Sequence, residues 1–540
     1  MTTADSSSSG RLDPRLEPQM VSRRDLVFVM VALLIAMLLA ALDQTIFGTA
    51  LPTIVGELSG VDQMLWVTTA YILAATIMMP VYGKLGDLFG HKRLFFSALA
   101  LFLGGSVLGG IAKDMPMLIG ARAVQGLGGG GLMILSMSII ADIVPPRRRG
   151  TYMGILGGAW AFSSVLGPIL GGWFADSIGW RWAFWFNLPL GTLAVVMAAV
   201  FLKMPLQKKA RPRLDTLGII TMAVATTALI LVTSWGGREY EWSSPVILGL
   251  IGGAVLLGGL FVWVERRAVE PIIPLGLFRD RNFNLVTIAG LFVSVAFFGV
   301  VVYIPTYLQM VTGLSATKAG LLLVPLSAGI LPASLGSGAL ASRTGRYKWM
   351  PLLSLSLVGV SLYLLSTLTA DTSLWLTCFY TFVHGLGMGI SFQILVLIVQ
   401  NSFPVADVGT ATGAHSFFRQ IGASFGSAAI GTLFTGRLME LLPQRLAAAG
   451  FAPTGATDPH SLTPALVNQM PEEVKTIIVS SYNDALAPVY LYIVPLMVAG
   501  FALLLFVKER PLALTNEPTR ESLPADASPA RKQAIVPEED

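Results

Sequence analysis

The chain has 540 residues, of which 54% are hydrophobic and 12% are charged, and this charged share is about half that of an average soluble protein. Together with a mean hydropathy of +0.70, the composition excludes a single soluble globule and indicates repeated membrane-spanning segments. The single cysteine, Cys378, excludes an intramolecular disulfide framework, and the four histidines match no zinc spacing. We therefore expect no metal site. Membrane orientation explains the net charge of +5, so no nucleic-acid partner is expected.

Fourteen apolar stretches are each long enough to cross about 30 Å of hydrocarbon at a rise of about 1.5 Å per residue. We predict spans at approximately residues 26–48, 64–82, 94–112, 115–141, 152–174, 183–202, 216–235, 245–264, 284–308, 319–340, 350–369, 374–400, 415–436 and 487–507. The expected fold class is therefore an all-α integral membrane protein with 14 transmembrane helices, which has the lipid bilayer as a partner.

Basic residues are distributed unequally between the connections that join these spans. If the N-terminus is cytoplasmic, 27 of the 36 Lys and Arg residues lie in inward-facing segments and seven in outward-facing ones, while Arg122 and Arg419 lie inside spans. Positive charge is enriched on the cytoplasmic side of membrane proteins. Both termini are therefore expected in the cytoplasm, and an even number of spans is favoured.

Two pairs of segments repeat each other along the chain. Residues 83–93, after the second span, share their glycines and terminal base with residues 338–348, after the tenth. Residues 125–130 and 384–389 form a second pair at nearly the same offset. The alternative is that glycine-rich strings recur by chance in a chain with 56 glycines. Two such pairs favour a duplicated membrane domain.

The repeat divides the chain into two six-helix bundles with two inserted helices between them. The expected segments are a disordered cytoplasmic tail at 1–25, an N-terminal bundle at 26–202, inserted helices with their flanking loops at 203–282, a C-terminal bundle at 283–507 that includes an external loop at 437–486, and a disordered cytoplasmic tail at 508–540. The polar, aperiodic composition of the two tails is typical of disorder.

Five motifs follow one another in the first half. They are Leu42-Asp43-Gln44-Thr45-Ile46 with Ala50-Leu51-Pro52; Gly83 to Arg93; Arg122, Gln125, Gly126 and Gly128; Gly157 and Gly158 with Gly167-Pro168-Ile169-Leu170-Gly171-Gly172; and Trp180-Arg181-Trp182 with Phe186-Asn187-Leu188-Pro189. In these motifs the sequence resembles the major facilitator superfamily, specifically its fourteen-span drug:proton antiporter branch. The first motif departs from the pattern of this branch in its middle, where Asn-Val is usual. In the second motif, His91 occupies a position where a basic residue is commoner.

The resemblance implies a monomeric secondary carrier in the plasma membrane, the inner membrane of a bacterium. It would export lipophilic drugs or antibiotics in exchange for protons by rocking two bundles around a central cavity. Protons would be the coupling ion, and no other cofactor is expected. An exporter of an endogenous lipid, glycolipid or secondary metabolite is the alternative. A membrane enzyme and a non-transporting sensor are less favoured, and the chain has no nucleotide-binding P-loop motif.

Asp43 is the only carboxylate inside the predicted spans, and a charge there costs roughly 2.5–3.5 kcal/mol on insertion scales. Asp43 and Arg122 are predicted at similar depth, so an ion pair is feasible. We expect Asp43, with Arg122 as its partner, to exchange a proton with water as the carrier alternates; a permanent salt bridge is the structural alternative. Arg419 is predicted in the first turn of its span, where its side chain can reach the interface.

Polar and aromatic residues near mid-membrane are candidates for the wall of the substrate cavity, although many such residues belong to protein cores or interfacial belts. The candidates are Trp66, Tyr71, Gln125, Tyr303, Tyr307, Gln309, His384, Gln393 and Gln400. A packing role for His384 is as well supported as a binding role. Because the second half has no membrane carboxylate, a neutral, zwitterionic or monocationic lipophilic substrate is favoured over a dication.

Two further motifs predict conformational roles. Charges after the second span could hold the two halves together in one state, and the expected residues of this latch are Gly83, Asp87, Gly90, Lys92, Arg93 and Arg147. Ser342 replaces the aspartate in the second half, which suggests one complete latch; a simple positive-inside cluster is the alternative. The resemblance implies that the antiporter motif, Gly167, Pro168, Gly171 and Gly172, seals the cavity through close packing, and a generic kink is the alternative.

Overall fold

The computed structural model describes residues 22–60, 63–204, 214–237, 239–314, 316–451 and 462–514. Within these residues the chain is helical, apart from one isolated bridge between Gly236 and Tyr240. Thirteen helices in this described part of the chain are long and apolar enough to cross a membrane. The fourteenth, α15 (Val408–Ala448), is longer but less apolar, and it packs inside the same bundle. The predicted all-α membrane fold is confirmed, while most of both predicted tails lies outside the described residues.

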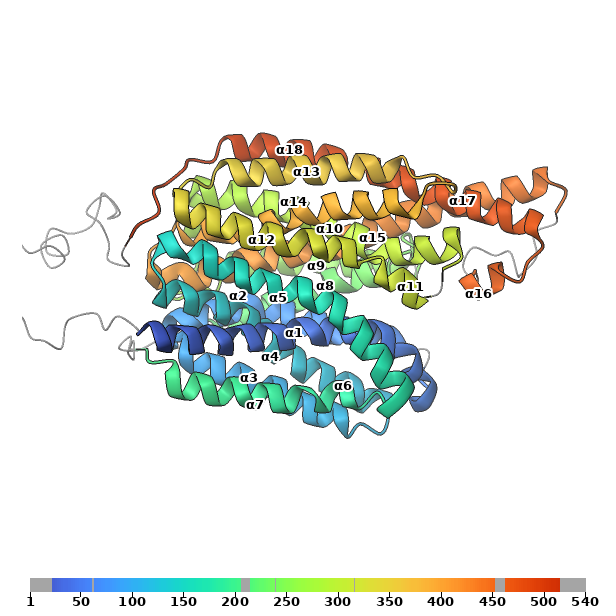
Figure 1. Ribbon diagram of the computed structural model, residues 1–540. Coiled ribbons are helices and arrows are strands. Elements are labelled where there is room, and N and C mark those ends of the chain that lie inside the picture. Colours follow the sequence, from blue (N-terminus) through green and yellow to red (C-terminus); the bar gives the residue numbers. More distant parts are fainter. Residues whose placement is uncertain are drawn as a thin grey trace, which may run out of the picture.

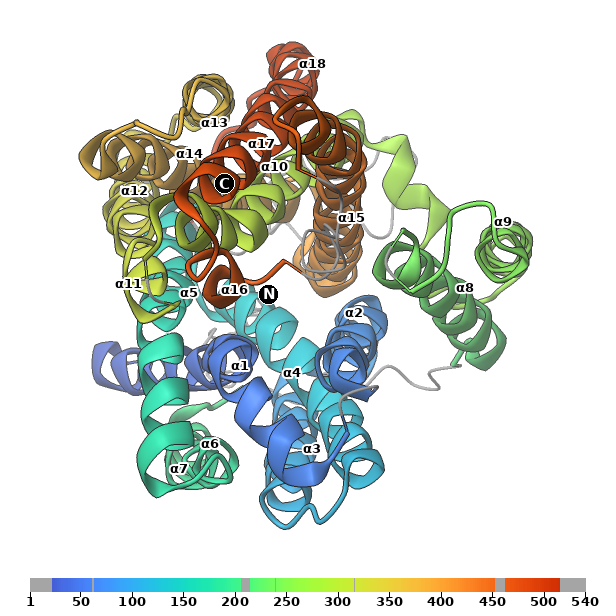
Figure 2. The same cartoon turned by 90° about the vertical axis from the view of Figure 1, so that its right-hand side faces the viewer.

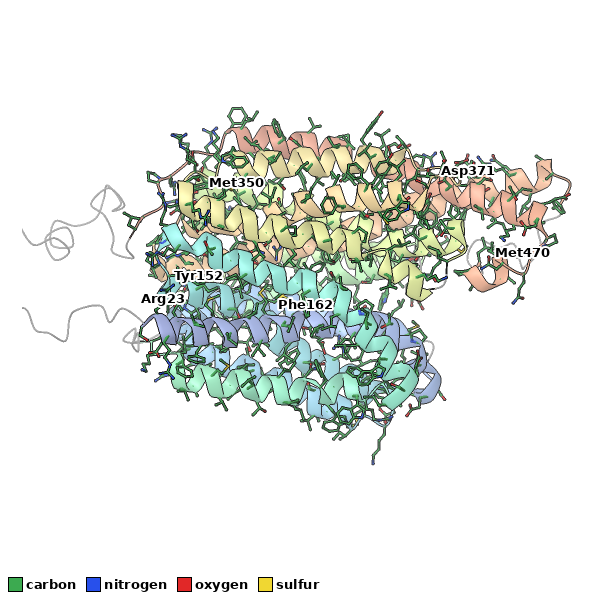
Figure 3. All side chains as sticks on the ribbon, viewed as in Figure 1. Arg23, Tyr152, Phe162, Met350, Asp371 and Met470 are labelled. Carbon is green, nitrogen blue, oxygen red and sulfur yellow. The ribbon has the colours of Figure 1, made fainter. Side chains whose placement is uncertain are left out.

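The helices run roughly parallel in one elongated bundle, and both described chain ends lie at the same end of it (Figure 1). We call this end the termini end and the other the distal end. Arg23, Tyr152 and Met350 lie toward the termini end, whereas Asp371 and Met470 lie toward the distal end (Figure 3).

The first half of the molecule contains the helices of the predicted N-terminal bundle. These are α1 (Arg23–Leu58), α2 (Met64–Phe89), α3 (His91–Gly110), α4 (Met115–Ile143), α5 (Pro146–Trp173), a π-helical turn Phe174–Ile178, α6 (Trp182–Trp185) and α7 (Asn187–Phe201). Polar caps define several starts: Ser22 accepts from the Asp25 amide before α1, and Asp114 accepts from the Met117 amide before α4.

The inserted helices α8 (Thr216–Trp235) and α9 (Pro245–Glu265) stand beside the two halves (Figure 2). Helix α8 contacts α2 and α15, whereas α9 packs mainly on α8, and only 6% of its apolar window is buried. The connection after α9 returns to the first half, where Lys84 Nζ lies 2.7 Å from Glu270 Oε2. The inserted pair is therefore peripheral and presents most of α9 to the membrane.

The second half follows a short 3₁₀ turn at Leu275–Arg279. It contains α10 (Arg281–Thr312), α11 (Ala316–Leu321), α12 (Val324–Thr344), α13 (Trp349–Ser366), α14 (Leu374–Gln400), a 3₁₀ turn Val405–Asp407, α15, α16 (Pro464–Val467), α17 (Glu472–Leu491) and α18 (Val494–Leu505). Residues 508–514, which were expected to be disordered, dock at the termini end, where Arg510 pairs with Asp280 at 2.6 Å and the Tyr347 hydroxyl donates to the Arg510 carbonyl.

The structure has helix where the sequence predicted most of an external loop at 437–486. Helix α15 continues to Ala448, and α17 starts at Glu472 and packs antiparallel to its far part. Arg445 and Asp484 form an ion pair of 2.7 Å between the two helices. Figure 1 shows this pair of helices extending past the other helices at the distal end.

Two close helix contacts join the halves: α2 with α15, and α5 with α12. At the first, a Cβ added to Gly83 would collide with the Gly409 backbone; at the second, a Cβ on Gly150 would lie 2.7 Å from the Gly338 carbonyl oxygen. Glycine therefore allows backbone to meet backbone at both contacts. Gly83 and Gly338 are equivalent in the predicted repeat, so the packing reproduces the internal symmetry read from the sequence.

Candidate functional site

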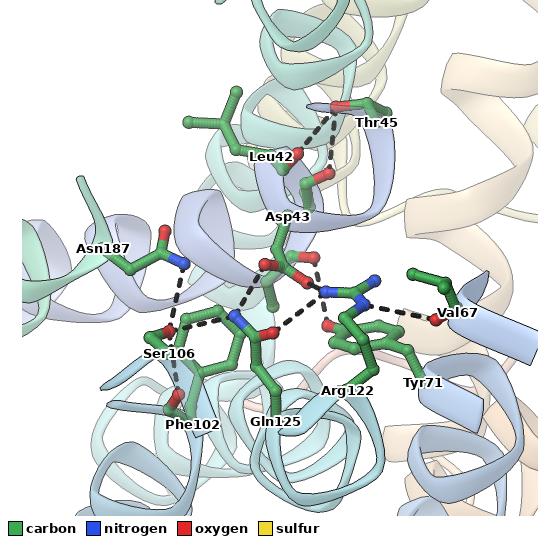
Figure 4. Close-up of polar contacts among 12 residues, drawn as sticks. Leu42, Asp43, Thr45, Val67, Tyr71, Phe102, Ser106, Arg122, Gln125 and Asn187 are labelled. Carbon is green, nitrogen blue, oxygen red and sulfur yellow. Dashed lines mark hydrogen bonds and ion pairs between the residues drawn. The ribbon is translucent and has the colours of Figure 1, made fainter. Parts of the chain in front are cut away.

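A buried ion pair joins the first and fourth helices of the first half. The Asp43 carboxylate on α1 pairs with the Arg122 guanidinium on α4, and their side chains are 0% and 1% exposed. Figure 4 shows the two side chains pointing toward each other between the helices. Because breaking such a pair leaves a charge buried without compensation, the pair holds α1 against α4 in this conformation.

The Asp43 carboxylate also receives a neutral donor. Gln125, one turn after Arg122, donates from Nε2 to Asp43 Oδ1 at 2.7 Å and to Ser106 Oγ at 3.0 Å, while its Oε1 accepts from Arg122 at 3.0 Å. Asn187 on α7 donates to Ser106 Oγ at 3.2 Å. One hydrogen-bond network therefore links α1, α3, α4 and α7 around a single carboxylate (Figure 4).

Aromatic rings enclose the cation of this network. Arg122 Cζ lies 4.1 Å from the ring centroid of Phe47 and 4.3 Å from that of Tyr71, and Arg122 Nε donates to the Val67 carbonyl at 3.3 Å. A desolvated arginine between two rings gains cation–π stabilisation. The Tyr71 hydroxyl donates to the Ala40 carbonyl at 3.3 Å. Tyr71 and Gln125, which the sequence assigned to the cavity wall, belong instead to this network.

A separate cavity, partly open to solvent, lies between the two halves. Its apolar wall includes Met37, Met79, Met133, Met137, Trp160 and Phe297. Its polar wall includes Gln44, Ser294, Ser334, Gln393, Ser416 and Gln420. Gln44 directly follows Asp43, so one residue of α1 faces the cavity while its neighbour faces the buried network.

Of the predicted cavity residues, Gln393 lines this cavity and the others lie elsewhere. Trp66 stacks edge-on against Trp235 of α8, with ring centroids 5.6 Å apart. The Tyr303 hydroxyl donates to the Ser427 carbonyl at 3.0 Å, and the Tyr307 hydroxyl to Asn483 at 2.8 Å. These tyrosines fix α10 to its neighbours, because a buried hydroxyl needs a partner.

The remaining predicted polar residues also serve helix packing. Gln309 donates to the Pro305 carbonyl in its own helix at 3.3 Å. His384 is 0% exposed, and its Nδ1 lies 2.8 Å from the Ser361 hydroxyl of α13. Gln400 donates to the Met137 carbonyl across the halves at 3.3 Å. The packing interpretation of His384 is thus the one that the geometry supports.

Arg419 lies in the cavity wall and not at the membrane interface as the sequence suggested. The difference has a simple cause. Helix α15 begins at Val408, so Arg419 is about three turns into it, where the predicted span had placed it in the first turn. Its Cζ is 4.9 Å from the ring centroid of Phe392, another cavity residue.

The predicted latch residues meet the second half at the termini end. Asp87 accepts from the Gly409 amide at 3.1 Å, from the Thr410 amide at 2.7 Å and from the Thr410 hydroxyl at 2.6 Å. The acid therefore caps the start of α15, where the helix dipole favours negative charge. Arg147, another predicted latch residue, donates to the carbonyls of Ser342 and Arg343, at 2.8 Å each.

The remaining residues of the loop between α2 and α3 have local roles. His91, which was not among the predicted latch residues, lies between two acids, with Nδ1 2.6 Å from Asp142 and Nε2 3.4 Å from Asp87. Gly90 adopts a φ of 92°, which suits glycine at the turn between α2 and α3. Lys92 donates to the Leu202 carbonyl, and Arg93 is exposed. Asp142 was not predicted as a partner of His91, because it lies at the end of α4, outside the motif at residues 83–93.

The glycines of the α5 motif pack on α1 within the first half. A Cβ on Gly167 would collide with Thr45, and one on Gly171 with the Ile46 carbonyl, whereas a Cβ on Gly172 would meet no atom of another helix within 4 Å. Thr49 donates to the Pro168 carbonyl at 3.3 Å. The motif thus fixes α5 beside the helix that carries Asp43.

Two similar helical halves around a cavity, built almost wholly from membrane-length helices, define a membrane transporter. Residues 33–427 match the Major Facilitator Superfamily, and the chain belongs to this family. Its members move solutes across membranes, so the expectation of a carrier rather than an enzyme is confirmed.

Named relatives agree with this assignment. The chain is 35% identical to the multidrug transporter protein MdtP of Bacillus subtilis, over 92% of this chain and 95% of the relative. It is 35% identical to multidrug resistance protein 3 of the same organism, over 92% and 98%. It is 42% identical to an MFS-type transporter of Mycobacterium tuberculosis, over 91% and 70%.

Solved structures share the fold at low sequence identity. The human organic anion transporter MFSD10 superposes with a TM-score of 0.59 at 16% identity, covering 90% of this chain and 100% of that one. The proton:xylose symporter XylE gives 0.58 at 14% identity, covering 91% and 98%. At these sequence identities, the structural similarity supports the shared fold and says nothing about the substrate.

Proposed function

We propose that the protein is a monomeric, proton-coupled antiporter that exports lipophilic drugs or antibiotics across the bacterial plasma membrane. The observation that carries this proposal is the Asp43 network. A carboxylate inside a membrane domain is costly and is expected to have a function. Here it lies next in sequence to the cavity residue Gln44, on a helix that the α5 motif packs closely.

The efflux direction rests on the relatives that are named multidrug transporters and on the distribution of charge. The termini end carries the basic connections, so we assign it to the cytoplasm. In this conformation the hydrogen bonds of Asp87 and Arg147 join the halves at that end. The structure then corresponds to a state closed toward the cytoplasm.

Coupling requires the Asp43–Arg122 pair to loosen during the cycle. When the carboxylate is ionised, the pair and the Gln125 bond hold α1 to α4. Protonation removes the negative charge, so Arg122 loses its ionic partner and α1 is freed to move relative to α4. A substrate in the cavity and a proton on Asp43 then act on the same helix, because α1 also supplies Gln44 to the cavity wall.

Transport by inside-out vesicles with an imposed pH gradient tests this function. Wild-type protein should accumulate dyes or antibiotics only when the gradient is present. Asp43→Asn should abolish gradient-driven accumulation while substrate binding and the detergent-solubilised fold persist. Glu472→Gln, at the exposed start of α17, removes a negative charge as Asp43→Asn does; it is the matched control and should transport normally. Undiminished gradient-driven export by Asp43→Asn would refute the coupling role.

A further inference from the structure

The two arginines within the membrane have opposite surroundings. Arg122 has an ionic partner, a carbonyl acceptor and two rings. Arg419 lines the central cavity, and within the described residues it has no carboxylate partner and donates no hydrogen bond; it rests on Phe392. An uncompensated cation at this depth is costly unless water or a ligand meets it.

Other polar groups in the cavity also lack protein partners. Ser294 Oγ, Ser416 Oγ and Gln393 Oε1 form no hydrogen bond within the described residues, although their side chains are 1%, 2% and 4% exposed. All three residues line the cavity with Arg419. Buried polar atoms are normally satisfied, so this group of unpaired atoms points to a bound polar species. Two serine hydroxyls and a guanidinium can all donate to an anion.

The rest of the wall favours a flat apolar body. Trp160 and Phe297 lie with ring centroids 5.0 Å apart, and Phe297 and Phe392 with centroids 5.3 Å apart. Phe392 is also the ring beneath the Arg419 guanidinium. A planar aromatic ligand can therefore lie against these rings while its acidic group reaches the guanidinium.

We propose that the central cavity selects compounds that carry one anionic group, such as a carboxylate, on a planar aromatic body, with Arg419 binding the anion. No Asp or Glu is among the described residues that line the cavity, so no carboxylate there attracts a cation. The sequence had favoured neutral, zwitterionic or monocationic compounds, and the position of Arg419 changes that preference. This inference rests on the proposed function only in taking the cavity as the transport site.

Three ligands that share one aromatic body and carry an anionic, a neutral or a cationic substituent test the proposal. Purified wild-type protein in lipid nanodiscs is titrated with anthracene-9-carboxylate, 9-anthracenemethanol and 9-anthracenemethylammonium, and ligand fluorescence reports binding. The carboxylate should bind at least about tenfold more tightly than the alcohol, and the ammonium ion most weakly; tenfold corresponds to about 1.4 kcal/mol. Equal binding of the three, or preference for the cation, would overturn the proposal without reference to any variant.

Variants then assign the preference to one residue. Arg419→Gln should abolish the preference for the carboxylate, and Arg419→Lys should keep part of it, because charge remains but the planar fork is lost. Arg437→Gln, a charge loss in the exposed part of the same helix, should leave it unchanged. A carboxylate preference that persists in a monodisperse Arg419→Gln protein would overturn the assignment. Because no proton gradient enters this assay, its outcome is independent of the antiport test.

Discussion

Asp87 and Ser342 occupy equivalent positions in the two halves, and each accepts a backbone hydrogen bond from the beginning of a helix in the opposite half. Asp87 accepts from the amides of Gly409 and Thr410 in α15, and Ser342 Oγ accepts from the Thr151 amide in α5 at 3.0 Å. The neutral serine hydroxyl thus binds a helix of the opposite half, as the charged aspartate carboxylate does. Both copies of the latch are present, and they differ in charge and in the number of hydrogen bonds that they accept.

The difference predicts unequal effects of two substitutions. Asp87→Ala removes three bonds to a carboxylate, each worth about 1.5–3 kcal/mol, whereas Ser342→Ala removes one neutral bond worth about 0.5–1.5 kcal/mol. Spin labels at Ser97 and Arg346, both exposed, in a Cys378→Ser background should therefore report a larger opened population for the first variant. Equal populations in the two variants would show that the carboxylate adds nothing to closure.

Within the α5 motif, neighbouring glycines should respond differently to alanine. A Cβ at Gly171 overlaps the Ile46 carbonyl of α1, so Gly171→Ala should lower the melting temperature in detergent by several degrees. Gly172 faces open space, and Gly172→Ala should be neutral or stabilising by up to about 1 kcal/mol, since alanine favours helix. Similar losses for both variants would contradict a packing role for the motif.

The buried ion pair predicts strong non-additivity. Arg122→Gln alone leaves the Asp43 charge without its cation and should destabilise the protein by about 3–5 kcal/mol. The double variant with Asp43→Asn removes both charges and should recover much of that loss, as measured by thermal unfolding of the three variants. Strictly additive shifts would mean that the two side chains do not interact in the folded protein.

Two residues of α14 separate packing from substrate contact. Gln393 lines the cavity and His384 does not, although both were candidates for the cavity wall. Gln393→Ala should weaken binding of a transported substrate several-fold with little change in melting temperature. His384→Gln should lower the melting temperature with little change in substrate affinity, because it disturbs the contact with Ser361 and leaves the cavity wall intact. An affinity loss confined to His384→Gln would place the histidine in the substrate path.

Sequence patterns predicted the membrane helices, the two halves and the pairing of Asp43 with Arg122, because hydropathy and insertion cost act on each helix separately. The cavity wall was harder to predict. Gln125 and Gln393 both lie in helices that are buried nearly all round, so no polar face indicates which side meets the cavity. Arg419 was misplaced for another reason: residues 408–414 are small and weakly apolar, and this concealed the first turns of α15.

The length of α15 has a practical consequence. Its 41 residues span about 60 Å at about 1.5 Å per residue, more than the roughly 40–45 Å of a bilayer with its headgroups. The far part, braced by α17 through Arg445 and Asp484, therefore stands in water as a rigid two-helix projection. An antibody fragment raised against the projection would give electron-microscopy images an alignment marker at the end of the molecule opposite to the Asp87 and Arg147 contacts.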